Sequence, residues 1–113
     1  MEIWKRSFEL VTEVYLLTKS FPDSEKFGLI TQIRRSAVSI PSNISEGCGR
    51  GSTRELIRFL NIALGSAFEL ETQLLLSARL SLGDSADIEK CLEELNQIQK
   101  MINGFIKSIA VSN

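Results

Sequence analysis

A chain of 113 residues with 43% apolar and 24% charged side chains can form one packed core and has the composition of an ordinary globular domain. Its formal net charge of −1 argues against a protein that coats nucleic acid through bulk electrostatics. No apolar run approaches the roughly 20 residues of a membrane helix, and the amino terminus lacks the apolar segment of a secretory signal. We therefore expect a cytoplasmic protein with one domain, residues 1–113.

The first predicted helix covers about residues 3–20 and ends at Phe21 and Pro22. Large side chains recur on one stripe of this helix, at Trp4, Phe8, Val11, Tyr15 and Thr18. We expect this stripe to face the core.

The second predicted helix, from residue 23 or 24 to residue 47, runs straight through a proline. Apolar residues step along it by four, three and four, at Ile33, Ala37, Ile40 and Ile44. Pro41 lies inside this series and costs roughly 3 kcal/mol in an unconstrained helix. Packing of the isoleucine face and hydrogen bonds from nearby small polar side chains must therefore hold a kink. These side chains are Ser36, Ser39, Ser42 and Asn43.

The third predicted helix covers residues 52–80 and follows a glycine-rich turn at 47–51. Ser52 and Glu55 have the spacing of a capping box, in which each side chain binds a free amide at the helix start. The expected core stripe is Leu56, Phe59, Leu60, Ala63, Ala67, Leu70, Leu74 and Ala78. Gly65 would cost about 1 kcal/mol relative to alanine, which predicts that a neighbouring backbone comes close.

A second apolar stripe lies about 100° from the first on this third helix. Its members are Ile57, Leu64, Phe68 and Leu75. The stripe has two interpretations, a broad core face or a self-association surface, since a monomer with a large exposed apolar patch is unusual.

A fourth predicted helix follows the break at residues 82–85. Apolar residues recur at helical spacing from Ile88 to Ile109. Four helices with short links predict an all-α fold, an antiparallel up-down-up-down four-helix bundle whose second helix is kinked at Pro41.

Three arginines near the start of the third helix, Arg50, Arg54 and Arg58, form a candidate site for an anion or nucleic acid. Free amides at the helix start would add to their positive charge. The glycines before them do not make a P-loop, because no lysine precedes Ser52. The alternative is that the arginines are solvated or pair with nearby carboxylates.

A structural polar network is expected along one strip of the second helix, at Arg35, Ser39, Asn43 and Glu46. Glu71 falls between the two apolar stripes of the third helix, where an unpaired carboxylate is costly. We predict that it pairs with Arg35, within one chain or across an interface between copies.

The chain has no histidine, the commonest general base and metal ligand. Cys48 and Cys91 lie far apart without a pairing motif, so we expect free thiols and no metal site. We predict no catalytic residue, no cofactor and no small-molecule substrate.

Four segments resemble a known family. They are Gln32-Ile33-Arg34-Arg35, Ser39-Ile40-Pro41-Ser42-Asn43-Ile44-Ser45-Glu46-Gly47, Arg58-Phe59-Leu60-Asn61-Ile62-Ala63 with Gly65-Ser66, and Glu69-Leu70-Glu71-Thr72-Gln73-Leu74. With these segments, almost the whole chain is similar to the four-helix-bundle proteins encoded by intervening sequences in bacterial 23S ribosomal RNA genes. The resemblance implies assembly as a ring, commonly a pentamer. Its best-understood relatives are accessory proteins of diversity-generating retroelements, basic rings that bind nucleic acid and a reverse transcriptase.

Our leading functional hypothesis is a non-enzymatic oligomeric adaptor for RNA or a nucleic-acid enzyme, with Arg50, Arg54 and Arg58 facing the anion. The alternative is a ring-forming structural scaffold that binds only protein partners, in which these arginines form salt bridges.

Overall fold

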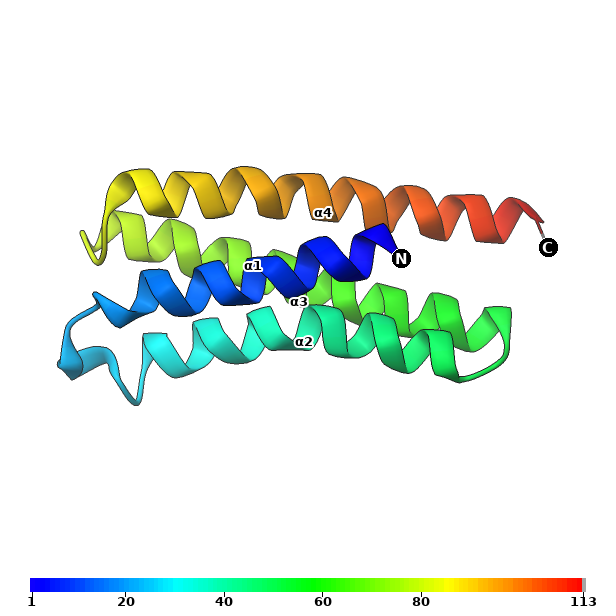
Figure 1. Cartoon of the computed structure of the whole chain (residues 1–113), viewed down its shortest axis with the longest axis horizontal. Helices are drawn as coiled ribbons and strands as arrows, with labels where there is room; N and C mark the ends of the chain where they lie inside the picture. Colours follow the sequence, from blue (N-terminus) through cyan, green and yellow to red (C-terminus); the bar gives the residue numbers. More distant parts are fainter. Residues whose placement is uncertain (113) are drawn as a thin grey trace.

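Four long helices, connected by short turns, make up the structure (Figure 1), a computed structural model that describes residues 1–112. They are α1 (Glu2–Lys19), α2 (Leu29–Gly49), α3 (Thr53–Arg79) and α4 (Ser85–Ser112), with a short 3-10 turn, η1 (Asp23–Glu25), before α2. Each helix packs against the next, and α1 also packs against α4. The predicted antiparallel up-down-up-down bundle is therefore confirmed.

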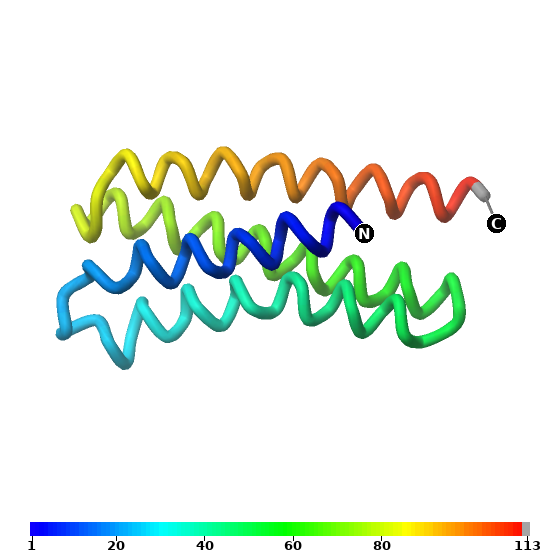
Figure 2. The backbone as a smooth tube through the Cα atoms, viewed as in Figure 1, coloured from blue at the N-terminus to red at the C-terminus, as the bar shows by residue number. Residues whose placement is uncertain are grey.

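The helices lie side by side along a bundle 47 Å long (Figure 2). The amino terminus of α1 stops part of the way along the bundle, so that α2, α3 and α4 extend past it at one end (Figures 1 and 2). Over the residues that are described, no helix has both the length and the apolarity needed to cross a lipid bilayer.

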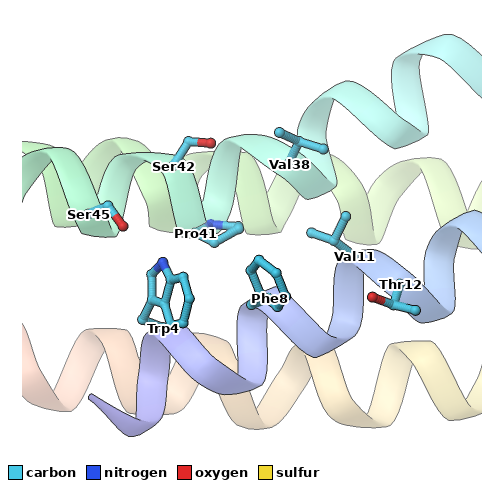
Figure 3. A pocket seen from close by; sticks show the side chains of 8 residues that line it. All are labelled: Trp4, Phe8, Val11, Thr12, Val38, Pro41, Ser42 and Ser45. Atoms are coloured by element: carbon cyan, nitrogen blue, oxygen red, sulfur yellow. The ribbon is translucent and has the colours of Figure 1, made fainter.

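The isoleucine stripe of α2 forms the centre of the core, as predicted. Four of its side chains are almost completely buried, Ile33, Ala37, Ile40 and Ile44. Pro41 is buried beside them, and the ribbon of α2 changes direction next to it (Figure 3). Packing of this face accordingly holds the helix through the proline.

The small polar side chains around Pro41 do not bind the carbonyl of Ala37, which the proline leaves free. Ser36 donates to the carbonyl of Ile33 at 3.1 Å, and Asn43 donates to that of Ser39 at 2.7 Å. The hydroxyls of Ser36 and Ser39 also form hydrogen bonds with side chains of α3. These two serines therefore connect α2 to α3 and do not replace the backbone hydrogen bond that Pro41 removes.

The predicted core stripe of α1 is wrong by roughly a quarter turn. The buried side chains are Ile3, Ser7, Leu10, Val14, Leu17 and Thr18. Of the predicted set only Thr18 is buried; Trp4, Phe8 and Tyr15 are exposed and Val11 is half-buried. Both stripes have helical spacing, but the aliphatic one faces the space between α2 and α4, and the aromatic one lies at the edge beside α2.

Other expectations also need correction. The second helix begins at Leu29 rather than at residue 23 or 24, because η1 and the non-helical Gly28 come first. In α3 the core stripe holds except that Leu56 is half-buried and Ala78 is exposed. Within residues 1–112, no atom apart from its own helix backbone and its two chain neighbours lies within 4 Å of a Cβ built at Gly65, so the expected close backbone is not found there.

We predict opposite effects for two glycine substitutions. Gly65→Ala should raise the free energy of unfolding by about 0.5–1 kcal/mol, since its methyl group meets open space and helix propensity improves. Gly47→Ala should lower it by about 1–3 kcal/mol, because its Cβ would lie 2.9 Å from the Phe59 Cβ. Urea denaturation of both variants tests this. Destabilisation by Gly65→Ala would contradict the open surface.

Candidate functional site

The three predicted arginines gather where α2 turns into α3. The guanidinium carbons of Arg50 and Arg58 lie 4.9 and 4.4 Å from the centroid of the Phe59 ring. Such contacts attract a cation to the ring electrostatically. The ring thus orders two positive groups at this end of the bundle.

Two of these arginines already bind carboxylates. Arg50 lies 3.1 Å from Glu46, and Arg58 donates to both carboxylate oxygens of Glu55, at 2.8 and 3.2 Å. Arg54 is exposed and has no hydrogen bond or ion pair with residues 1–112. The predicted alternative, in which the arginines pair with nearby carboxylates, therefore holds for Arg50 and Arg58. The guanidinium of Arg54 is unpaired.

Electrostatics at this turn reflect the pairing. The hydrogen bond from Arg58 lowers the pKa of the Glu55 carboxyl below its ordinary value and raises the pKa of Arg58. Half of the predicted capping box is present: the Ser52 hydroxyl accepts from the Glu55 amide at 3.1 Å. The other half is wrong, because the Glu55 carboxylate binds Arg58 instead of an amide.

The polar network predicted on α2 is a set of contacts with α3. Ser39 and Ser66 share a hydrogen bond of 2.8 Å, and Ser36 donates to Gln73 at 2.7 Å. Asn43 donates to the Ser39 hydroxyl at 2.9 Å. Glu46 lies outside this network, since its partner is Arg50.

Glu71 does not pair with Arg35 within one chain. It is half-buried, and its partner is Gln99 of α4, whose amide donates to its carboxylate at 3.1 Å. Arg35 is exposed and has no hydrogen bond or ion pair in the part of the chain that is described. The intrachain form of the prediction is wrong, and the form between copies stays a prediction.

The second stripe of α3 lies on the flank toward α4, which the bond from Glu71 to Gln99 identifies. Ile57 and Leu64 are half-buried there. Phe68 and Leu75 are 52% and 54% exposed. The stripe is therefore only partly a core face, and large apolar side chains project from it.

A groove of about 590 Å³ runs between α1 and α2 on the opposite side of the bundle (Figure 3). Its lining is Trp4, Phe8, Val11, Thr12, Val38, Pro41, Ser42 and Ser45. The rings of Trp4 and Phe8 lie 5.0 Å apart and form one wall. Sequence reasoning missed this groove because it assigned the aromatic stripe of α1 to the core.

Arg34 lines a neighbouring hollow, which shares Val38 with this groove. Its guanidinium donates to the Thr18 hydroxyl at 2.8 Å and lies 4.4 Å from the centroid of the Tyr15 ring. Arg34 therefore joins α2 to α1, whereas its neighbour Arg35 points to solvent.

The described residues contain no cluster of histidine, cysteine, aspartate or glutamate that can hold a metal ion. Cys48 is exposed beside the glycine-rich turn, and Cys91 is buried in the core. Burial raises the pKa of the Cys91 thiol to about 11. The protonated thiol is therefore an apolar core group.

Fold and surfaces together define a small four-helix bundle with apolar side chains on two outer flanks. The family model of the 23S rRNA-intervening sequence protein matches residues 1–104. The chain belongs to this family, and the resemblance found in its sequence is confirmed.

A crystal structure at 1.70 Å is similar over nearly the whole chain. It is of a protein of unknown function from the S23 ribosomal protein family of Bacteroides thetaiotaomicron VPI-5482. The two share 31% sequence identity with a TM-score of 0.86, over 93% of this chain and 98% of that one. No curated protein matches this chain. These comparisons indicate no enzymatic family.

The two cysteines should react very differently with a thiol reagent. At about pH 7.5 we expect iodoacetamide to label Cys48 alone in the native protein and both thiols in urea, because only Cys48 is accessible. Mass spectrometry counts the labels, and equal labelling of the native thiols would contradict the buried position.

Since the pKa of the Cys91 thiol is raised in the folded state, its contribution to the free energy of unfolding is present below about pH 9 and falls as the pH rises toward 11.

Proposed function

We propose that the protein is a non-enzymatic helical bundle that associates with copies of itself and serves as a scaffold or adaptor. The apolar stripe on the α3 flank carries this proposal. Phe68 and Leu75 keep about half of their surface exposed, although large aliphatic and aromatic side chains stabilise most when they are buried. A second copy would cover them.

The non-enzymatic part of the proposal rests on the site chemistry. The chain has no histidine, and residues 1–112 hold no metal-ligating cluster. One thiol, Cys48, is exposed and the other, Cys91, is buried, and the chain has no histidine to act as a general base for either. The ring implied by the family resemblance, commonly a pentamer, is the form of assembly that we expect.

Charge reversal on the stripe tests self-association. The double variant Phe68→Glu, Leu75→Glu should be monomeric in size-exclusion chromatography with light scattering, because it places two carboxylates in the apolar contact. Leu76→Glu is the matched control. Leu76 is 45% exposed but points about 100° away from Leu75, so its variant should assemble as the wild type does. An assembled double variant would overturn the proposal.

A second candidate function, binding of RNA, is favoured by the arginines at the α2–α3 turn. The guanidinium of Arg54 has no ion pair, and those of Arg50 and Arg58 pack against the Phe59 ring. Glu46 and Glu55 compete with a phosphate for two of the three guanidiniums. This competition and the net charge of −1 limit the affinity expected for RNA.

Fluorescence anisotropy with a structured RNA tests the second candidate. Affinity should fall between about 50 and 200 mM salt and drop roughly tenfold in the Arg54→Ala, Arg58→Ala variant. Glu46→Gln with Glu55→Gln should strengthen binding, because it frees two guanidiniums. Arg79→Ala, at the far end of α3, is the control and should bind as the wild type does. Affinity that ignores salt, or survives loss of the arginines, would eliminate this candidate.

A further inference from the structure

We propose that the groove between α1 and α2 binds an acidic amphipathic helix of a partner protein. This inference rests on the adaptor role proposed above and names the chemistry of the partner. The groove lined by Trp4 and Phe8 meets the hollow lined by Arg34 and Arg35, because Val38 lines both. We call the two together the extended groove.

One section of the extended groove is apolar. The rings of Trp4 and Phe8 point from α1 toward Pro41 of α2, with Val11 and Val38 farther along (Figure 3). Phe8 is 54% exposed and Val38 is 39% exposed, so this section presents uncovered apolar surface. An apolar helix face laid over it would remove that surface from water on both proteins.

The other section is positively charged and has no counter-charge. Arg34 and Arg35 line it, and no carboxylate lines either part of the extended groove. Neither guanidinium forms an ion pair with residues 1–112. The Thr18 hydroxyl holds Arg34 in place at 2.8 Å, whereas Arg35 is exposed. A partner that brings carboxylates would therefore complement this section.

Two carboxylates of the walls that could have offset this charge lie elsewhere. Glu13 of α1 lines a hollow with Lys90, on the side of α1 that faces α4. Glu46 of α2 pairs with Arg50 at the α2–α3 turn. The extended groove accordingly favours an acidic partner over a basic one.

A helix suits this groove better than an extended chain does. Both walls are helices, and nearly all of their backbone groups are bonded within the helix, so they offer no strand edge with which an extended peptide could pair. A bound helix satisfies its own backbone groups and needs only side-chain contacts. Apolar anchors on one helix face can then enter the space between α1 and α2.

Residue spacing along α2 gives the dimensions of the partner helix. Ser45 lines one end of the extended groove and Thr31 lines the other, which corresponds to about 21 Å at 1.5 Å per residue. A helix of about 14 residues spans this length. Val38 and Arg35 are about one turn apart, so the partner should carry its carboxylates about one turn beyond its last apolar anchor.

Selection from a displayed library of helical peptides tests the partner chemistry. With the wild-type protein as bait, the enriched peptides should carry apolar residues at helical spacing over about two turns, and Asp or Glu about one turn farther on. A library that enriches no helical peptide, or that enriches peptides without acidic residues, would overturn the inference.

Fluorescence anisotropy with one enriched, labelled peptide locates its binding site. Phe8→Glu should weaken binding at least tenfold, because it places a carboxylate in the apolar section. Leu16→Glu is the matched control: Leu16 is an exposed apolar residue of α1 that lines the hollow toward α4, and its variant should bind as the wild type does. Circular dichroism checks that both variants remain helical. Equal affinity of the wild type and Phe8→Glu would overturn the site.

Charge exchange tests the positively charged section. Arg35→Glu should weaken binding of the peptide about fivefold, and replacing the peptide's carboxylates with lysines should restore binding to this variant. Arg79→Glu, on α3, is the control and should leave affinity unchanged. Loss of binding that the exchanged peptide does not restore would contradict the predicted charge contact.

The assembly state separates this inference from the proposed self-association. A Phe8→Glu variant that becomes monomeric would overturn the inference, because a second copy would then occupy the groove. Failure to enrich peptides on an assembled wild-type protein would overturn the inference and leave self-association standing. A monomeric wild type that binds the acidic peptides through the groove would overturn self-association and support the partner site.

Discussion

Close packing of α2 against α3 is the constraint on which the other surfaces depend. Small side chains let the two helices approach, and a Cβ on Gly47 would lie only 2.9 Å from the Phe59 Cβ. The hydroxyls of Ser36 and Ser39 cross this contact and fix its register. Because that register is fixed, the outward-facing side chains of α2 and α3 keep fixed positions relative to one another along the bundle.

The fold could be predicted from the sequence because each helix carries apolar residues at helical spacing, and because Gly and Ser occur in the turns between the helices. The α2 stripe was clear, since Ile33 and its companions have no competing stripe nearby. In α1 two periodic stripes compete, and size suggested the aromatic one. Burial favoured the aliphatic one, since compact branched side chains fill the interior of a bundle and large rings suit its edge.

The candidate site was less predictable, because it depends on partners that sequence spacing does not rank. Arg58 has Glu55 three residues before it, and Arg50 has Glu46 four before, which are helical pairing distances. Glu46 and Glu55 therefore form ion pairs with two of the three arginines that were proposed to bind an anion. For Glu71 the sequence indicated that the carboxylate needs a partner but could not identify it. The partner, Gln99, lies on α4, and the rotation of α4 about its axis is defined only in the packed bundle.

We propose that self-association is the central property of the molecule and that the polar turn between α2 and α3 binds a second partner. Sedimentation velocity of the wild-type protein over a wide concentration range tests this most directly. We expect a discrete species larger than the monomer that persists on dilution. A single monomer at every concentration would contradict the account.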